Sequence, residues 1–397
     1  MINEKDVVKE QLRDERTHRV DTIGFKTNEA KQLLEFCIEL NNQDDRNAHP
    51  DNSEFKPDLG QWKIIKDSRA GKKDDPTKNG FGPFNNAWIA LQKSAGDEYA
   101  LAIRGTVGQA RSILNDVLAT TIPADSGIEF PKNRNLPITF ATTPRAEVHL
   151  GFAYAAFSIL FDNERGIVNL LRSGLIPPGA KLFITGHSQG AAIGTLVHAY
   201  LHYAITDPTD RYQLKDKRLT LKSYVFAQPK PGNYQLALDF ARIAGHHGTA
   251  FVINNNLDAV PQLPINQQTI AESIADAVSE NQGHGRGASG VLIDGLAKAG
   301  KAVFWARNLF AEHIANKVDK LYSLEQAKNI DTSYFDGIAK IPEQAVNSLN
   351  YTLSGTLIPV FGISGGGNLY PPASSDKPDL LLQHHATTYR KLINQQL

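Results

Sequence analysis

Short apolar runs and longer stretches with helical spacing alternate along this chain. Runs rich in β-branched and aromatic residues predict strands, and they lie at 62–66, 87–91, 98–106, 181–185, 222–228 and 250–255. Apolar residues that recur every three or four positions predict helices, and these lie at 27–41, 149–174, 190–205 and 235–245. Because strands and helices alternate, we expect an α/β domain with a mostly parallel central sheet.

The pattern changes after residue 264, where the chain becomes rich in alanine and helical in spacing. A glycine-rich break at 283–290 precedes one apolar stripe, which runs from Leu292 to Leu321 in steps of three or four. We interpret this stretch as a helical insertion in the α/β core. Three segments follow along the chain: a core part at 1–264, the insertion at 265–350, and the rest of the core at 351–397.

Composition and charge exclude several classes of protein. The chain has 397 residues, with 42 Lys plus Arg and 42 Asp plus Glu, scattered and mixed. A nucleic-acid-binding protein should instead show a basic excess or a clustered basic face. Cys37 is the single cysteine, so no intramolecular disulfide can form. Its place on the apolar side of the 27–41 helix predicts a buried, unreactive thiol.

The distribution of apolar residues also gives expectations about where in the cell the protein is found. The first twenty residues lack the apolar segment of a Sec signal peptide. No run of about 18 apolar residues occurs, so we expect no transmembrane helix. We therefore expect a cytoplasmic protein, or one exported without a cleavable signal.

Two serines stand in the G-x-S-x-G pattern of a nucleophile elbow. Ser188, in "GHSQG", follows the apolar strand at 181–185 and precedes the helix at 190–205. Such a turn exposes the serine, and the N-terminus of the helix offers a backbone N–H to an oxyanion. Ser364 is followed by glycines and two prolines, so no helix can begin there. We predict that Ser188 is the nucleophile and that Ser364 is a turn residue.

A nucleophilic serine needs a base, and the base needs an orienting carboxylate, in the chain order Ser, Asp or Glu, His. Asp258 fits the carboxylate because it comes shortly after the strand at 250–255. Asp239 lies inside a predicted helix, where we expect it on the solvent face. His384 and His385 are candidates for the base because they lie late in the chain, before a terminal helix. Two earlier histidines fit less well, His284 in the glycine-rich break and His313 in the long helix.

Five motifs occur in one order along the chain: "LAIRGT" ending at Gly105–Thr106, "VHLGF" (148–152), "GHSQG" (186–190), "FAQPKPGN" (226–233) and "NNLDAVPQLP" (255–264). In this set the chain resembles the class 3 lipases, the fungal-lipase-like branch of the α/β-hydrolases. The resemblance covers roughly 85–265 and the last forty residues. In that family a tyrosine commonly follows the late histidine by five positions. His384 and Tyr389 match this spacing, so the resemblance favours His384 over His385.

The resemblance implies an α/β-hydrolase fold and hydrolysis of lipid esters by a Ser-His-Asp mechanism. Ser188 would be the nucleophile, His384 the base and Asp258 the residue that orients it. The N–H of Gln189, with the N–H and hydroxyl of Thr106, would stabilise the oxyanion. No cofactor or metal is implied, and the expected partner is a lipid or ester substrate.

Several alternatives stay open. A phospholipase A1 or an acyltransferase would use the same triad, and a lipase-like interaction protein could lack activity altogether. The insertion at 265–350 departs from the family's short connection. It fits either a static helical subdomain or a lid that makes transient contact with a lipid surface. His198 and His202 have the spacing of metal ligands, but no acidic third ligand is near, so we expect them to be structural.

Overall fold

The computed structural model of the protein describes residues 23–41, 53–69, 80, 86–94, 96–104, 120–125, 128–130, 134–136, 138–162, 164–258, 260–262, 264, 346–347, 350–363 and 382–397. Except near its end, the expected insertion at 265–350 therefore lies outside the described residues, as do Ser364, His284 and His313. Val346–Asn347, in the segment expected to be helical, form the short strand β12 instead.

A seven-stranded sheet lies at the centre of the molecule, in the order β1-β2-β3-β8-β9-β11-β14. Its strands are β1 (Trp62–Asp67), β2 (Ala87–Lys93), β3 (Glu98–Arg104), β8 (Lys181–His187), β9 (Thr220–Phe226), β11 (Ala250–Asn255) and β14 (Thr356–Val360). Neighbours from β3 to β14 are parallel, whereas the pairs β1–β2 and β2–β3 are antiparallel. Every predicted strand is present. The pattern missed β14, where Pro359 interrupts the apolar run, as an edge strand tolerates.

A second sheet consists of strands too short for the sequence pattern to predict. Its order is β12-β4-β7-β10-β13, and a separate hairpin pairs β5 with β6. The new strands are β4 (Thr120–Pro123), β5 (Ile128–Phe130), β6 (Arg134–Leu136), β7 (Glu147–His149), β10 (Gly232–Asn233) and β13 (Tyr351–Thr352). All their pairings are antiparallel.

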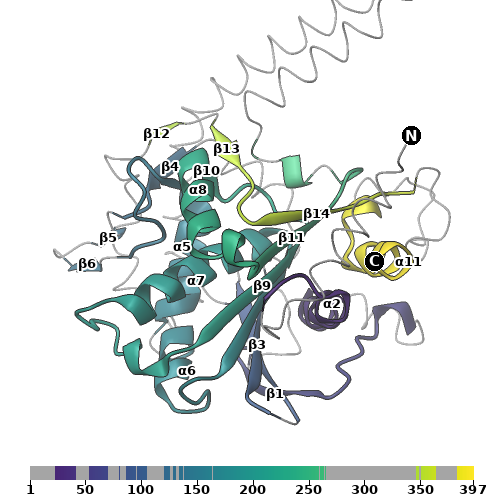
Figure 1. Ribbon diagram of the computed structural model, residues 1–397, viewed down its shortest axis with the longest axis horizontal. Helices are drawn as coiled ribbons and strands as arrows, with labels where there is room; N and C mark the ends of the chain where they lie inside the picture. The colour runs from purple at the N-terminus through teal and green to yellow at the C-terminus, as the bar shows by residue number, and fades with distance from the viewer. Residues whose placement is uncertain are drawn as a thin grey trace, which may run out of the picture.

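Helices cover both faces of the central sheet, with α5, α6 and α7 on one side and α2 and α11 on the other (Figure 1). The helices are α2 (Thr27–Asn41), α5 (Leu150–Phe161), α6 (Ile167–Arg172), α7 (Gln189–Thr206), α8 (Tyr234–Ile243) and α11 (Ala386–Gln396). Short 3-10 turns are η2 (Ser53–Phe55), η3 (Lys215–Lys217), η4 (Gly245–His247), η5 (Val260–Gln262) and η8 (Leu382–His384). This arrangement confirms the expected α/β-hydrolase fold with a mostly parallel sheet.

The helix predicted at 149–174 is in fact two helices, α5 and α6. Asp162 ends α5 because its Oδ1 accepts the backbone N–H groups of Glu164 and Arg165, at 3.0 and 2.7 Å. These bonds offer the backbone a turn in place of another helical step. Among the residues that the structure describes, no helix combines the length and the apolar character needed to cross a bilayer.

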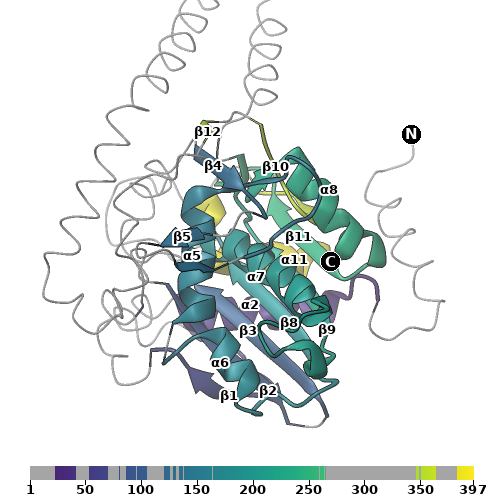
Figure 2. The same ribbon diagram turned by 90° about the vertical axis from the view of Figure 1, so that its left-hand side faces the viewer.

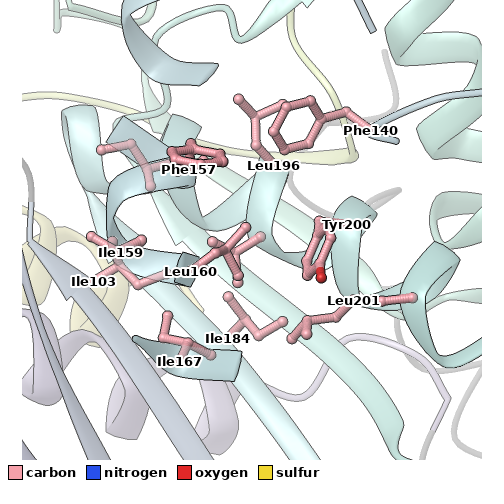
Figure 3. Packing of buried hydrophobic residues seen from close by; sticks show 14 of the residues in the cluster. Ile103, Phe140, Phe157, Ile159, Leu160, Ile167, Ile184, Leu196, Tyr200 and Leu201 are labelled. Atoms are coloured by element: carbon pink, nitrogen blue, oxygen red, sulfur yellow. The ribbon is translucent and has the colours of Figure 1, made fainter. Parts of the chain in front are cut away.

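The main hydrophobic core lies between the sheet and α5–α7, which stand in front of the strands in Figure 2. Figure 3 shows Ile103 of β3 and Ile184 of β8 among side chains from these helices, such as Leu160 and Leu196. Each is at most 1% exposed. Burying one such side chain contributes roughly 2 kcal/mol relative to leaving it in water. This packing holds β8 and α7, the two elements that flank Ser188.

A second core lies on the opposite face, between the sheet and helices α2 and α11. Cys37 belongs to it and is 1% exposed. Burial raises the pKa of its thiol to about 12, so the cysteine is uncharged at neutral pH. The burial of this thiol expected from the sequence is confirmed.

Candidate active site

Ser188 stands on a sharp turn between β8 and α7. Its backbone has φ 60° and ψ −133°, a conformation that is rare for a residue other than glycine. The turn is held by hydrogen bonds from Ser188 N to Phe226 O, 3.0 Å, and from Ala191 N to Ser188 O, 2.8 Å. The strand–turn–helix geometry expected of a nucleophile elbow is therefore present at this serine.

Gly186 shows why this turn needs a residue without a side chain. A Cβ there would lie 2.2 Å from the carbonyl oxygen of Gly190, and backbone atoms cannot move aside cheaply. We expect Gly186→Ala to lower the free energy of unfolding by about 3 kcal/mol through this overlap. Chemical denaturation monitored by circular dichroism measures it.

Gly194→Ala is the matched control, because Gly194 lies in the adjoining helix α7 and packs against the same strand, β8. A Cβ at Gly194 would meet its nearest neighbour at 3.6 Å, which is ordinary van der Waals contact. Because alanine favours a helix over glycine by about 1 kcal/mol, this variant should be as stable as the parent or more stable. Equal losses in Gly186→Ala and Gly194→Ala would contradict the argument.

The structure brings Ser188, His384 and Asp258 into one hydrogen-bonded chain. His384 Nε2 lies 2.8 Å from Ser188 Oγ, and His384 Nδ1 lies 2.8 Å from Asp258 Oδ2. The three come from different elements: Ser188 follows β8, Asp258 follows β11, and His384 ends η8. His385 instead occupies the N-cap position of α11. Of the two adjacent histidines, His384 makes both contacts.

Tyr389 of α11 and the backbone of Val260 fix the carboxylate of Asp258. Tyr389 donates its hydroxyl to Asp258 Oδ2 at 2.9 Å, and Val260 N donates to Asp258 Oδ1 at 2.9 Å. Burial and the charge of Asp258 raise the pKa of Tyr389 well above its usual range, so the hydroxyl keeps its proton. With Asp258 only 3% exposed, its position is set by these donors rather than by water.

Gln189 is the first residue of α7, so its backbone N–H lies at the N-terminal end of the helix. Helix N-termini favour negative charge, because the N–H groups and the helix dipole point that way. Thr106, the second expected oxyanion donor, lies outside the described residues. Strand β3, which leads toward it, is paired with β8 up to Ile103 and Gly186, beside the elbow.

The prediction that Asp239 lies on a solvent face of its helix is wrong. Asp239 is fully buried on α8 and accepts hydrogen bonds from the hydroxyl groups of Thr143 and Tyr203. It also forms an ion pair with Arg242 at 3.0 Å. These partners hold the carboxylate on α8, and the contact with His384 is made by Asp258.

His198 is a core residue, which is one of the two structural placements, core or surface, that the sequence left open. It is 2% exposed, and its Nδ1 lies 2.8 Å from Ser223 Oγ. Burial lowers its pKa to about 3, so it is neutral in the folded protein. Within the described part of the chain, no group of three or more His, Cys, Asp or Glu side chains could hold a metal ion.

The sequence analysis missed two residues that surround the candidate site, Asn255 and His187. Asn255 ends β11, where its N–H donates to the Tyr389 hydroxyl at 2.9 Å and its Nδ2 donates to Gln383 O at 3.0 Å. His187 ends β8 and contacts the backbone of His384. Both lie inside the motifs, and that placement is the only signal that could have drawn attention to them.

Comparison with known proteins gives a consistent result. The family model for lipase (class 3) matches residues 100–268, which confirms the resemblance seen in the motifs. The secreted mono- and diacylglycerol lipase MDL4 of Malassezia globosa is 30% identical over 169 residues, 42% of this chain and 46% of that protein. The chain thus spans about half the length of the curated relative it matches.

Similar solved structures are also lipases. The M37 lipase is 19% identical with a TM-score of 0.42, covering 65% of this chain and 74% of that one. A lipase from Rhizopus microsporus var. chinensis is 17% identical with a TM-score of 0.38, covering 62% and 72% respectively.

Proposed function

We propose that this chain, whose residues 100–268 match the family model for lipase (class 3), is a serine hydrolase that cleaves carboxylic esters of lipids. The observation that carries this proposal is the hydrogen-bonded chain from Ser188 through His384 to Asp258, with 2.8 Å at each link. An elbow serine with a base and an orienting carboxylate is the arrangement that acyl transfer to serine requires.

The proposed reaction has two steps. Ser188 Oγ attacks the acyl carbonyl while His384 Nε2 takes its proton, and His384 then gives that proton to the leaving alcohol. In the second step, water gives a proton to His384 and attacks the acyl-enzyme, which releases the fatty acid and restores Ser188. Asp258 keeps the Nδ1–H of His384 in place and stabilises the imidazolium.

Oxyanion stabilisation is assigned to Gln189 and Thr106 in this proposal. The N–H of Gln189 would donate from the end of α7, and Thr106 would donate its N–H and hydroxyl. Loss of one such donor typically raises the barrier by about 3 kcal/mol. The support is the position of Gln189 at a helix N-terminus, and for Thr106 the family motif "R-G-T".

The substrate class rests on the family and on the named relative. The relative is named a mono- and diacylglycerol lipase, which makes acylglycerols the first substrates to test. Phospholipase A1 and acyltransferase activities use the same triad and differ in what enters the pocket or accepts the acyl group.

The test compares p-nitrophenyl esters of increasing chain length, an acylglycerol emulsion and phospholipid vesicles, with Ser188→Ala as the blank. We expect the parent protein to react with a fluorophosphonate probe and to release fatty acid faster from acylglycerol than from phospholipid. Faster release from phospholipid would assign it as a phospholipase. No labelling and no hydrolysis would contradict the proposed function.

A further inference from the structure

Each carbonyl of the turn that carries His384 accepts a hydrogen bond from a side chain of another element. Thr388 Oγ1 of α11 donates to Leu382 O at 2.6 Å, and Asn255 Nδ2 of β11 donates to Gln383 O at 3.0 Å. His187 Nε2, at the end of β8, lies 2.8 Å from His384 O. Because η8 has only three residues, its position depends on such outside contacts rather than on its own hydrogen bonds.

The His187 bond defines the state of that ring. A carbonyl oxygen can only accept, so His187 must carry its proton on Nε2 and donate it to His384 O. Burial, with the nearby His384 and His385, holds the pKa of His187 well below its usual range. His187 therefore stays neutral while His384 gains a proton, and its donor is in place throughout the reaction.

The ring of His187 also packs directly beside the catalytic candidates. Its centroid lies 4.8 Å from the ring of His384 and 5.7 Å from that of Tyr389, the latter edge to face. His187 is 6% exposed, so neither contact competes with water. The residue thus contacts both His384 and Tyr389, the partner of Asp258.

We propose that His187 is a positioning residue that holds His384 in register with the nucleophile. The inference rests on the proposed function. His187 precedes Ser188 in the chain but is 197 positions from His384, so its hydrogen bond joins the backbone of the base to the backbone of the elbow. A shift of about 1 Å between nucleophile and base is enough to cost about a hundredfold in rate.

The first test replaces His187 with Leu, Gln or Asn. Gln places a donor nitrogen the same number of bonds from Cβ as Nε2 of histidine, whereas Asn is one bond shorter and Leu has no donor. We expect His187→Leu and His187→Asn to lower kcat on a soluble short-chain ester by about a hundredfold with little change in KM. His187→Gln should recover most of the parent rate, and fluorophosphonate labelling rates should follow the same order.

His198→Leu is the matched control, because His198 is also a buried, neutral histidine with one hydrogen-bond partner. It lies away from Ser188, so it should lose stability while keeping the parent kcat per folded molecule. The positioning role is overturned if His187→Leu keeps the parent kcat, if His198→Leu loses as much, or if Gln is no better than Asn. Should His187→Leu fail to fold, the Gln and Asn pair alone decides the question.

These outcomes separate the two proposals. If the parent protein does not react with the fluorophosphonate, the proposed function fails. If it reacts, and Ser188→Ala does not, but all three His187 variants react at the parent rate, the positioning role fails alone.

Discussion

Ser188→Ala is expected to abolish ester hydrolysis, with a loss of about a millionfold in kcat, the size seen when a triad nucleophile is removed. The fold should survive. Ser188 is the N-cap of α7 but makes no side-chain cap hydrogen bond, so the usual cap loss of about 1 kcal/mol does not apply. Initial rates on a p-nitrophenyl ester and thermal unfolding of the same samples measure the two effects.

Ser364→Ala is the control, because Ser364 stands in the other G-x-S-x-G pattern of the chain. We expect it to keep the parent activity and to react with a fluorophosphonate as fast as the parent. An inactive Ser364→Ala beside an active Ser188→Ala would show that the wrong elbow had been chosen.

His384→Ala should lower kcat by at least about a thousandfold, since the serine then has no base to take its proton. His385→Ala should cost far less, because His384 makes both contacts, to Ser188 Oγ and to Asp258 Oδ2. Steady-state kinetics on a soluble ester compare the two variants. The opposite order of losses would transfer the role of base to His385.

A double variant adds a second test of the same chain of contacts. Residues that act as one unit are strongly non-additive. Ser188→Ala combined with His384→Ala should therefore be about as inactive as Ser188→Ala alone. If the loss of kcat in the double variant instead equalled the product of the two single losses, the two residues would act independently.

Much of the central sheet could be predicted from the sequence. Buried strands appear as apolar runs, and β8 and β11 are buried along their whole lengths. The elbow could also be predicted, because a strand, two glycines around a serine and a helix are all encoded within about a dozen neighbouring residues. Short antiparallel strands such as β10 and β13 could not, since two residues carry no period.

Within the candidate site, Ser188 and Asp258 could be predicted as nucleophile and orienting carboxylate because each comes after a predicted strand. The residues alone left His384 and His385 open, since both come late and both precede a helix; the family spacing to Tyr389 favoured His384. In the tertiary structure, the ring of His384 meets Ser188 and Asp258, whereas His385 occupies the N-cap position of α11 without a side-chain cap hydrogen bond. Adjacent residues have nearly the same sequence context, so only the direction of each side chain separates them.

Asp239 and His187 likewise have polar partners that are distant in the chain and therefore could not be predicted from the sequence. Asp239 is fully buried because Thr143 and Tyr203, 96 and 36 positions away, supply its donors. His187 reaches a carbonyl 197 positions further along the chain. The sequence by itself determined most strands of the central sheet, the helices beside them and the elbow, because apolar periodicity and glycine placement act between near neighbours. Which polar groups meet was decided only by the tertiary structure, because their partners come from strand and helix ends that packing brings together.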